Sequence, residues 1–267
     1  MSLHQRARGH LVVDIKQRDG ISTLADLRQE GCLKARFPRP VDWLEVITLN
    51  SSGGIAGGDR VASNLRVQSG ARATFAGQAA ERYYRALPTD APAHIRTSLR
   101  IEPNAAAEWL PQDSILFDRC AIDRVLDVEV AVGAWFLGLE TLIFGRAALG
   151  ETIATARIAD TVRIRQNGRL RLQETIRIDG EVASTLARPA TAAGATAIAT
   201  IVMVGEPAPP LDRLREILKP YEAGATAWND TLIARIVAKD SANLRAAILP
   251  SLDLLRAGRA LPRVWIC

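Results

Sequence analysis

The residues of this 267-residue chain that could do chemistry are carboxylates set into apolar strand patterns. Glu140 and Glu174 each occupy a position where the two-residue alternation of a strand otherwise places leucine, isoleucine or phenylalanine. A carboxylate on such a face must be paired, hydrogen-bonded or set beside water, because burying it alone is costly. A structural ion pair with an arginine is one interpretation. The other is a polar passage lined by carboxylates, whose hard oxygen atoms hold a divalent cation loosely.

A glycine-rich segment, residues 51–59, combines backbone freedom with an acid. Two glycine pairs flank Ile55, and Asp59 follows the second pair. Glycine accepts positive φ and lets another chain approach closely. The functional interpretation is therefore a tight turn that contacts a partner or an ion. The alternative is an ordinary wide turn between predicted strands at residues 44–49 and 61–67. The spacing differs from the GxGxxG pattern of dinucleotide-binding proteins.

A third segment, residues 108–118, has an acid at each end, Glu108 and Asp118. Its apolar and aromatic residues supply core or interface area, and Pro111 predicts an interruption at a sheet edge or a bulge. The two acids could act as a pair in a carboxylate-dependent hydrolase if the fold set them about 5 to 9.5 Å apart.

Most familiar catalytic motifs are absent from the sequence. It contains no GxxxxGK[ST] phosphate loop, so we expect no hydrolysis of GTP or ATP by that route. It has neither a GxSxG nucleophile elbow nor an HExxH zinc motif. The histidines have no metal-ligand spacing on one helix face, and there are only three: His4, His10 and His94.

The composition is typical of a soluble, cytoplasmic, globular protein. The three cysteines (Cys32, Cys120 and Cys267) are far apart, which indicates a reducing compartment rather than a disulfide framework or a structural zinc site. The first residues have no apolar signal segment, and the longest apolar run falls short of the roughly 20 residues of a membrane helix. The net charge of +5 favours acidic partners. Because the arginines are scattered, we expect binding neither to nucleic acid nor to a membrane.

Period-two alternation dominates the chain and predicts strands at residues 10–15, 95–101 and 126–132. The segment 157–184 predicts a three-stranded antiparallel meander. Its first turn is Asn167-Gly168, a type I′ hairpin signal. Its second turn is Asp179-Gly180, which leads into residues 182–186.

Two helices are expected near the C-terminus. The first covers residues 211–218, and the second runs from Ser241, as N-cap, to a stop at Gly258, with a kink at Pro250. The pattern therefore predicts one mainly-β, antiparallel-strand-rich domain over residues 1–267 with two C-terminal helices. The order of strands in the sheet does not follow from the pattern.

Five segments of the chain resemble motifs of the UreD (also called UreH) urease accessory family, and they occur in the family's order. They are residues 49–59, 78–85, 108–118, 144–151 and 261–265, of which 108–118 is the most specific match. Two departures stand out. The second segment contains Arg82 and a tyrosine pair where a lysine and a single tyrosine are more usual, and Leu149 replaces a common methionine.

The resemblance implies a mainly-β domain with β-helix-like stacking and two helices, and it implies no catalysis by this chain. Family members bind the accessory protein UreF and, through it, the GTPase UreG. The complex docks on urease apoprotein and supports nickel transfer into its active site. An internal passage for the ion has been proposed for the family. No cofactor is expected to bind tightly, and nickel binds only transiently.

The resemblance also carries site residues onto this chain. Asp59 is the first candidate for the passage, Glu140 comes next, and Asp118 and Glu151 end matching segments. Glu174 rests on the strand-face argument alone. Further motif residues are expected in structural or partner contacts: Gly53, Gly54, Gly57, Gly58, Trp109, Pro111, Gln112, Phe117, Arg263 and Trp265. The absence of cysteine and histidine clusters suits a conduit, because soft, tight ligands would trap nickel.

Two other functions stay open on the residues alone. A carboxylate-dependent hydrolase on a β scaffold requires two acids facing each other across a cleft. A plain interaction module for acidic proteins or nucleic acid requires an affinity that falls steeply with salt.

Overall fold

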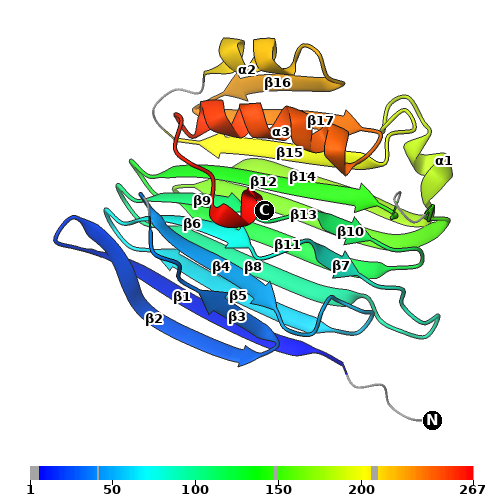
Figure 1. Cartoon of the computed structure of the whole chain (residues 1–267), viewed down its shortest axis with the longest axis horizontal. Coiled ribbons are helices and arrows are strands. Elements are labelled where there is room, and N and C mark those ends of the chain that lie inside the picture. The colour runs from blue at the N-terminus through cyan, green and yellow to red at the C-terminus, as the bar shows by residue number, and fades with distance from the viewer. Residues whose placement is uncertain (1–5, 41, 147–149, 206–209, 267) are drawn as a thin grey trace.

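The computed structural model describes residues 6–40, 42–146, 150–205 and 210–266, and its strands form a seven-stranded and a ten-stranded sheet (Figure 1). The seven-stranded sheet has the order β14-β13-β11-β8-β5-β1-β2. Its strands are β1 Arg8–Arg18, β2 Ile21–Gly31, β5 Arg60–Val67, β8 Ala93–Ile101, β11 Ala121–Val130, β13 Thr155–Gln166 and β14 Arg169–Glu181.

The ten-stranded sheet has the order β16-β17-β15-β12-β9-β6-β4-β3, and the short strands β10 and β7 extend it beside β12. Its strands are β3 Leu33–Arg36, β4 Leu44–Asn50, β6 Arg72–Gly77, β7 Glu81–Tyr83, β9 Ala106–Leu110, β10 Ser114–Leu116, β12 Trp135–Phe144, β15 Ala197–Val204, β16 Ala223–Trp228 and β17 Thr231–Ala238. The mainly-β prediction is confirmed.

From β4 to β13 the main strands alternate between the two sheets. β4, β6, β9 and β12 enter the ten-stranded sheet, and β5, β8, β11 and β13 enter the seven-stranded sheet. Neighbours formed in this way are parallel, and among the described residues nine strand pairings are parallel and six antiparallel. The prediction of a mainly antiparallel sheet is therefore wrong, because both sheets are mixed. Period-two alternation identifies the buried face of a strand but not the direction of its neighbour.

The expected meander is half correct. Asn167 and Gly168 have φ of 53° and 74° and join β13 to β14, which confirms the hairpin. The third strand is wrong, because residues 182–186 form the short helix α1 (Val182–Leu186). The strand β14 continues through the predicted second turn, and its Gly180 pairs with Ala156 of β13. Pairing along the whole of β13 thus overrides a local turn signal.

The two predicted C-terminal helices are present, and they cover the outer face of the ten-stranded sheet. Helix α2 (Leu211–Leu218) lies over β16, and α3 (Ser241–Leu255) lies over β15 and β17 (Figure 1). The N-cap of α3 is Asp240, not Ser241, because an Asp240 carboxylate oxygen accepts a hydrogen bond from the backbone of Asn243 at 2.8 Å. The helix contains Pro250 and ends before Gly258. None of the helices in the described ranges is long and apolar enough to span a membrane.

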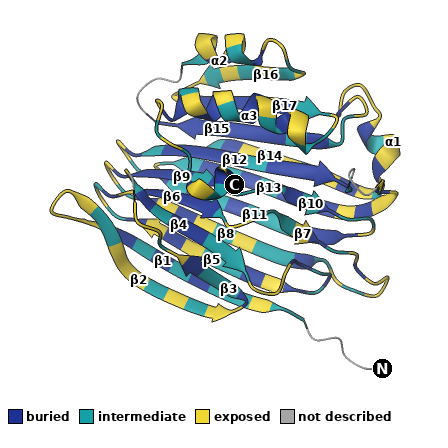
Figure 2. Cartoon of the chain, viewed as in Figure 1, coloured by how far each residue is buried: buried dark blue, intermediate teal, exposed yellow. Residues whose placement is uncertain are grey.

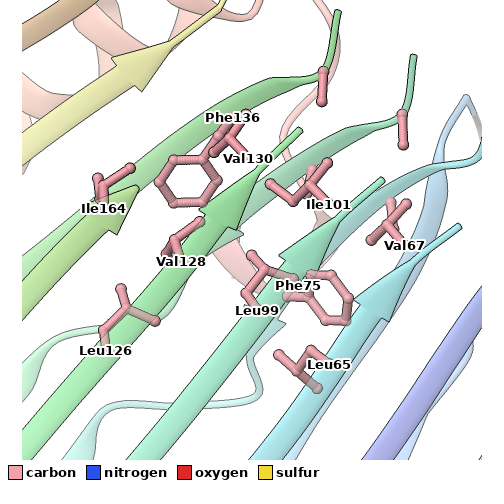
Figure 3. Close-up of a cluster of buried hydrophobic side chains, with 14 of the residues drawn as sticks. Leu65, Val67, Phe75, Leu99, Ile101, Leu126, Val128, Val130, Phe136 and Ile164 are labelled. Carbon is pink, nitrogen blue, oxygen red and sulfur yellow. The ribbon is translucent and has the colours of Figure 1, made fainter. Parts of the chain in front are cut away.

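The apolar core has three parts. The first and third clusters lie between the sheets, and the second lies between the ten-stranded sheet and helices α2 and α3. Figure 2 shows the resulting band of buried residues along β12 and β15. In the first cluster, Phe75 and Phe136 of the ten-stranded sheet pack against side chains such as Leu99 and Val128 of the opposite sheet (Figure 3).

A buried charge network fastens the end of α3 to the ten-stranded sheet. Glu108 on β9 has no exposed surface. Its carboxylate accepts two hydrogen bonds from Arg256 at 3.0 Å, one from Arg259 at 2.6 Å and one from Thr74 at 2.6 Å. The final segment adds its own contacts, since the Trp265 indole donates to the Leu110 carbonyl at 3.1 Å. The C-terminal layer is thus held by polar bonds as well as by apolar packing.

We predict that Glu108→Gln lowers the free energy of unfolding by about 3–5 kcal/mol, because it leaves buried guanidinium groups without a counter-ion. Urea denaturation of the purified chain measures the change. Glu102→Gln is the matched control, because it breaks a glutamate–arginine pair with Arg66 at a partly exposed site. Equal losses of stability in the two variants would contradict the importance of the Glu108 network.

Candidate functional site

A row of polar side chains interrupts the apolar core between the two sheets. Strands β11 to β15 each turn one polar residue inward at the boundary between the first and third clusters, and Arg235 of β17 continues the row. On β13, for example, Asp160 lies between the apolar residues Ile158 and Val162, which belong to different clusters. We call this row the polar seam. It consists of Arg124, Glu140, Asp160, Glu174, Thr200 and Arg235.

Arg124 lies at the centre of the polar seam and binds carboxylates from both sheets. Its Nε and Nη2 atoms donate to the two oxygen atoms of Asp160 at 2.8 and 2.6 Å. Its Nη1 atom lies 2.8 Å from Glu140 Oε2 and also donates to Ser114 Oγ at 3.1 Å. The side chain is only 11% exposed. Although burial disfavours the charged form, the neighbouring carboxylates hold the pKa of Arg124 well above its ordinary value.

Glu140 projects from β12 into the space between the sheets. Its Oε1 atom accepts a hydrogen bond from the Trp109 indole at 2.7 Å, and Arg124 neutralises the other oxygen. Burial raises the pKa of Glu140, and the Arg124 charge opposes that shift. The sequence-based expectation of a carboxylate on an apolar strand face is correct for this residue, and its arginine partner satisfies the structural interpretation.

Glu174 lies at the outer end of the polar seam. Its Oε1 atom accepts a hydrogen bond from Thr200 at 3.2 Å and lies 3.1 Å from the guanidinium of Arg235. Its Oε2 atom is buried and has no hydrogen-bond partner. Burial raises the pKa of Glu174, opposed mainly by Arg235. One carboxylate oxygen of Glu174 is therefore buried without a hydrogen-bond donor.

Two cavities border the polar seam. The larger has a volume of about 320 Å³ and is lined by Glu81, Arg124 and Glu140 among others. The smaller has a volume of about 20 Å³, room for about one water molecule. It is lined by Glu140, Asp160, Glu174 and Thr200, with apolar neighbours. Glu140 borders both cavities.

Three of the five segments that resemble the family motifs line the larger cavity. Ile55 of the glycine-rich segment pairs with Tyr83 of β7, and β7 in turn pairs with β10 from the third segment. Trp109, Pro111 and Gln112 of that segment also border the cavity. Motifs that are distant in the sequence therefore build one wall.

Glu81, which sequence reasoning did not single out, is the carboxylate of this cavity that has no ion pair among the described residues. The Asn50 amide donates long hydrogen bonds to its two carboxylate oxygen atoms, at 3.4 and 3.5 Å. Burial raises the pKa of Glu81 from 4.5 to about 7. Asp160 was missed as well. The strand-face rule that selected Glu174 would have selected it, because Asp160 interrupts the same kind of apolar alternation.

Asp59 lies outside both cavities and is occupied by its own turn. Its two oxygen atoms accept hydrogen bonds from the backbone of Ala7 and of Ala56, both at 2.8 Å. The residue is 5% exposed. These bonds support a turn-shaping role at the start of β5.

Asp118 and Glu151 also lie outside the two cavities. An Asp118 oxygen accepts hydrogen bonds from the backbone of Ala154 and Thr155 at 2.9 and 3.1 Å. Glu151 accepts one from Arg146 at 2.6 Å. The structure thus brings Glu140 and Glu174 together and leaves the other three predicted acids elsewhere. Residues 147–149 of that segment, including Leu149, lie outside the described residues.

The glycines of residues 51–59 meet steric requirements of the turn between β4 and β5. Gly54 has a φ of 147°, and a Cβ atom there would lie 2.4 Å from the Tyr84 ring. Gly53 has a φ of 79°, and its carbonyl accepts a hydrogen bond from the Tyr84 hydroxyl at 2.8 Å. Gly57 is confined by Ala86, and Gly58 also has positive φ. The glycine-rich motif therefore packs against the chain itself.

The remaining motif residues of the third segment contact the second, fourth and fifth segments. The Gln112 side chain donates to the Val264 carbonyl at 2.7 Å. The Phe117 ring stacks edge-on with Tyr84, and the Arg146 guanidinium lies 4.2 Å from its centre. Arg263 begins the 3-10 helix Arg263–Trp265.

The described residues contain no group of three or more histidine, cysteine, aspartate or glutamate side chains that could hold a metal ion. The polar seam instead offers carboxylate oxygens that are neutralised by arginine. Hard oxygen donors of this kind are ligands for divalent cations, and here arginine side chains already hold them. The arrangement is suited to brief contact with a cation and lacks an activated nucleophile.

Comparison with known proteins identifies one family. The model of the family described as UreD urease accessory protein matches residues 7–266. The chain is 41% identical over 264 residues to urease accessory protein UreD 1 of Bradyrhizobium sp. (strain ORS 278), which covers 98% of this chain and 94% of that protein. It is 40% identical over 264 residues to urease accessory protein UreD of Rhodopseudomonas palustris (strain HaA2), with the same coverage.

We predict that Glu81 makes stability depend on pH. Because its folded-state pKa is raised from 4.5 to about 7, the folded chain retains a proton that the unfolded chain releases as pH rises through this range. Its contribution therefore destabilises the fold increasingly between these values and levels off above them, at about 3 kcal/mol.

Glu81→Gln should remove this loss and raise the free energy of unfolding above pH 7, with little effect at low pH. Urea denaturation of both chains across the range measures it. Glu216→Gln on the exposed side of α2 is the control. Identical pH profiles for Glu81→Gln and the unmodified chain would show that Glu81 is ionised at its ordinary pKa.

Proposed function

The chain belongs to the UreD family of urease accessory proteins, and from this premise we propose that it supports nickel insertion into urease apoprotein. Its role is in urease maturation, and the family is one of accessory proteins rather than enzymes. The alternative of a carboxylate-dependent hydrolase is therefore wrong. Nickel is the cargo of this process, and no tightly bound cofactor is part of the proposal.

The polar seam and its two cavities form the proposed internal path for the ion. The observation that carries this proposal is the position of Glu140, whose carboxylate borders both cavities. Glu81 offers an unpaired carboxylate in the larger cavity, and Glu174 offers an oxygen atom without a hydrogen-bond partner in the wall of the smaller one. Oxygen ligands of this kind accept nickel without retaining it, which suits delivery.

Asp59, Asp118 and Glu151 stay predicted contacts of the ion, with support only from the family resemblance. Their hydrogen bonds to backbone groups and to Arg146 favour a structural role. A substitution at Asp59 is therefore expected to act first on the turn and on partner binding.

We further propose that the chain works in the cytoplasm within a complex. The proposed partners are UreF, the GTPase UreG through UreF, and urease apoprotein, with neither nucleic acid nor a membrane involved. We treat residues 1–267 as one domain, because the core between the sheets continues from β1 to β17. The alternation of strands between the sheets is our basis for the proposed β-helix-like stacking.

Urease activation in cells tests the path. Cells that carry the urease and accessory genes, with this gene deleted, receive the unmodified gene, Glu140→Gln or Glu174→Gln. We expect each variant to lower urease activity by roughly 10- to 100-fold, the scale for groups that contact or orient around a metal. Glu216→Gln is the matched control on the surface of α2.

Pull-down of the partner proteins accompanies the assay, so that a folding or binding defect is recognised. Full activity in both seam variants would place the ion path elsewhere in the chain. Full urease activity in cells that lack this gene and receive no copy of it would overturn the role of this chain in urease activation.

A further inference from the structure

A fixed positive charge stands in the middle of the proposed path. Arg124 borders the larger cavity, and the two carboxylates that it binds, Glu140 and Asp160, border the smaller one. Its guanidinium occupies the oxygen atoms that a cation would use between the two cavities. The five donors of a guanidinium in a planar fork allow Arg124 to bind both carboxylates at once.

The charge balance around the smaller cavity depends on this residue. Three carboxylates, Glu140, Asp160 and Glu174, border the cavity, and two guanidinium groups, Arg124 and Arg235, are bonded to them. With all five ionised, the net charge is −1. Without Arg124 it would be −2, which is the charge that one divalent cation neutralises.

The two arginines differ in their exposure to water. The side chain of Arg124 is 11% exposed, whereas that of Arg235 is 58% exposed. Water screens the charge of an exposed group and lets it move away from its partner. Arg124, which binds two of the three carboxylates, therefore controls the electrostatics of the smaller cavity more strongly than Arg235, which binds one.

Without the Arg124 charge, the three carboxylates in the wall of this cavity, which has room for about one water molecule, would attract a divalent cation more strongly than they do beside the guanidinium. Strong binding would oppose delivery, because the ion has to leave. Arg124 lowers the affinity for the ion, because an incoming cation has to displace the guanidinium from the same oxygen atoms.

We propose that Arg124 is a built-in competing cation that keeps the affinity of the Glu140–Asp160–Glu174 cavity for a divalent cation low. This inference rests on the proposed function, because weak binding of nickel is useful only if the ion has to be passed on. It concerns the cavity in the purified chain, however, and can be tested without urease.

Equilibrium dialysis of the purified full-length chain against nickel chloride at one fixed pH measures this affinity. We expect Arg124→Gln to bind one nickel ion at least about tenfold more tightly than the unmodified chain, because a full charge is removed within hydrogen-bond distance of the ligands. Arg235→Gln should tighten binding less. Arg163→Gln is the matched control, because Arg163 binds Asp127 at 2.7 Å away from both cavities.

A double variant links the gain to the cavity. Arg124→Gln combined with Glu140→Gln should lose most of the added affinity, since it removes a ligand as well as the competitor. Persistence of tight binding in the double variant would overturn the assignment to this cavity. So would an unchanged affinity in Arg124→Gln, provided that its thermal unfolding stays cooperative.

A conservative variant covers the case in which Arg124→Gln does not fold. Arg124→Lys retains the charge but loses the fork that binds two carboxylates together, so we expect a folded chain with an affinity between the two extremes. Unchanged nickel affinity in folded Arg124→Lys would overturn the proposal.

The cell assay separates this inference from the proposed function. Tighter nickel binding by Arg124→Gln together with full activity of Glu140→Gln in cells would support the competing cation and reject the path. Impaired urease activation by Glu140→Gln together with an unchanged nickel affinity of Arg124→Gln would support the path and reject the competing cation.

Discussion

A guanidinium buried between two apolar sheets requires carboxylates for its donors, and Arg124 finds them on both sheets. Asp160 comes from the neighbouring strand of the same sheet, and Glu140 comes from β12 of the sheet opposite. Removing one partner from such a cluster leaves a buried charge without compensation, which costs far more than the cluster contributes when it is complete. The three strands must therefore keep one relative position. That position in turn sets the boundary between the two apolar clusters and places Glu140 beside both cavities.

The remaining layers support this central arrangement without taking part in it. The ten-stranded sheet has helices on its outer face, and the Glu108 network joins the end of α3 to β9. The next residue on β9, Trp109, faces the opposite side and donates its indole hydrogen to Glu140. Two successive residues of one motif thus connect the helical layer to the polar seam. This explains in physical terms why acids and an aromatic residue stand next to each other at this point of the sequence.

Sequence patterns predicted the parts of the fold that depend on one strand at a time. The alternation around Glu140 and Glu174 identified both as inward-facing carboxylates, and the same rule applies to Asp160. Partners lie far apart in the sequence, so the pattern could not show that Arg124 joins them or that most neighbouring strands run parallel. The turn signal at Asp179-Gly180 failed because pairing with β13 outweighs a local preference. Asp59 is the first candidate on its motif, but one of its two backbone hydrogen bonds comes from Ala7, 52 residues away, which the motif does not show.

The alternation of strands between the sheets has a consequence for how the chain folds. The parallel pairings of the seven-stranded sheet join residues 29 to 52 positions apart, as the Ala93–Ile122 and Arg8–Arg60 pairs illustrate. Each pairing must therefore close a long loop before it gains any stability, and proteins dominated by such non-local pairings fold slowly. During that time the open edge of the last completed strand is exposed to other chains. Synthesis of this protein thus creates a period of vulnerability to aggregation, whose length is set by the connectivity of the sheets rather than by the stability of the finished fold.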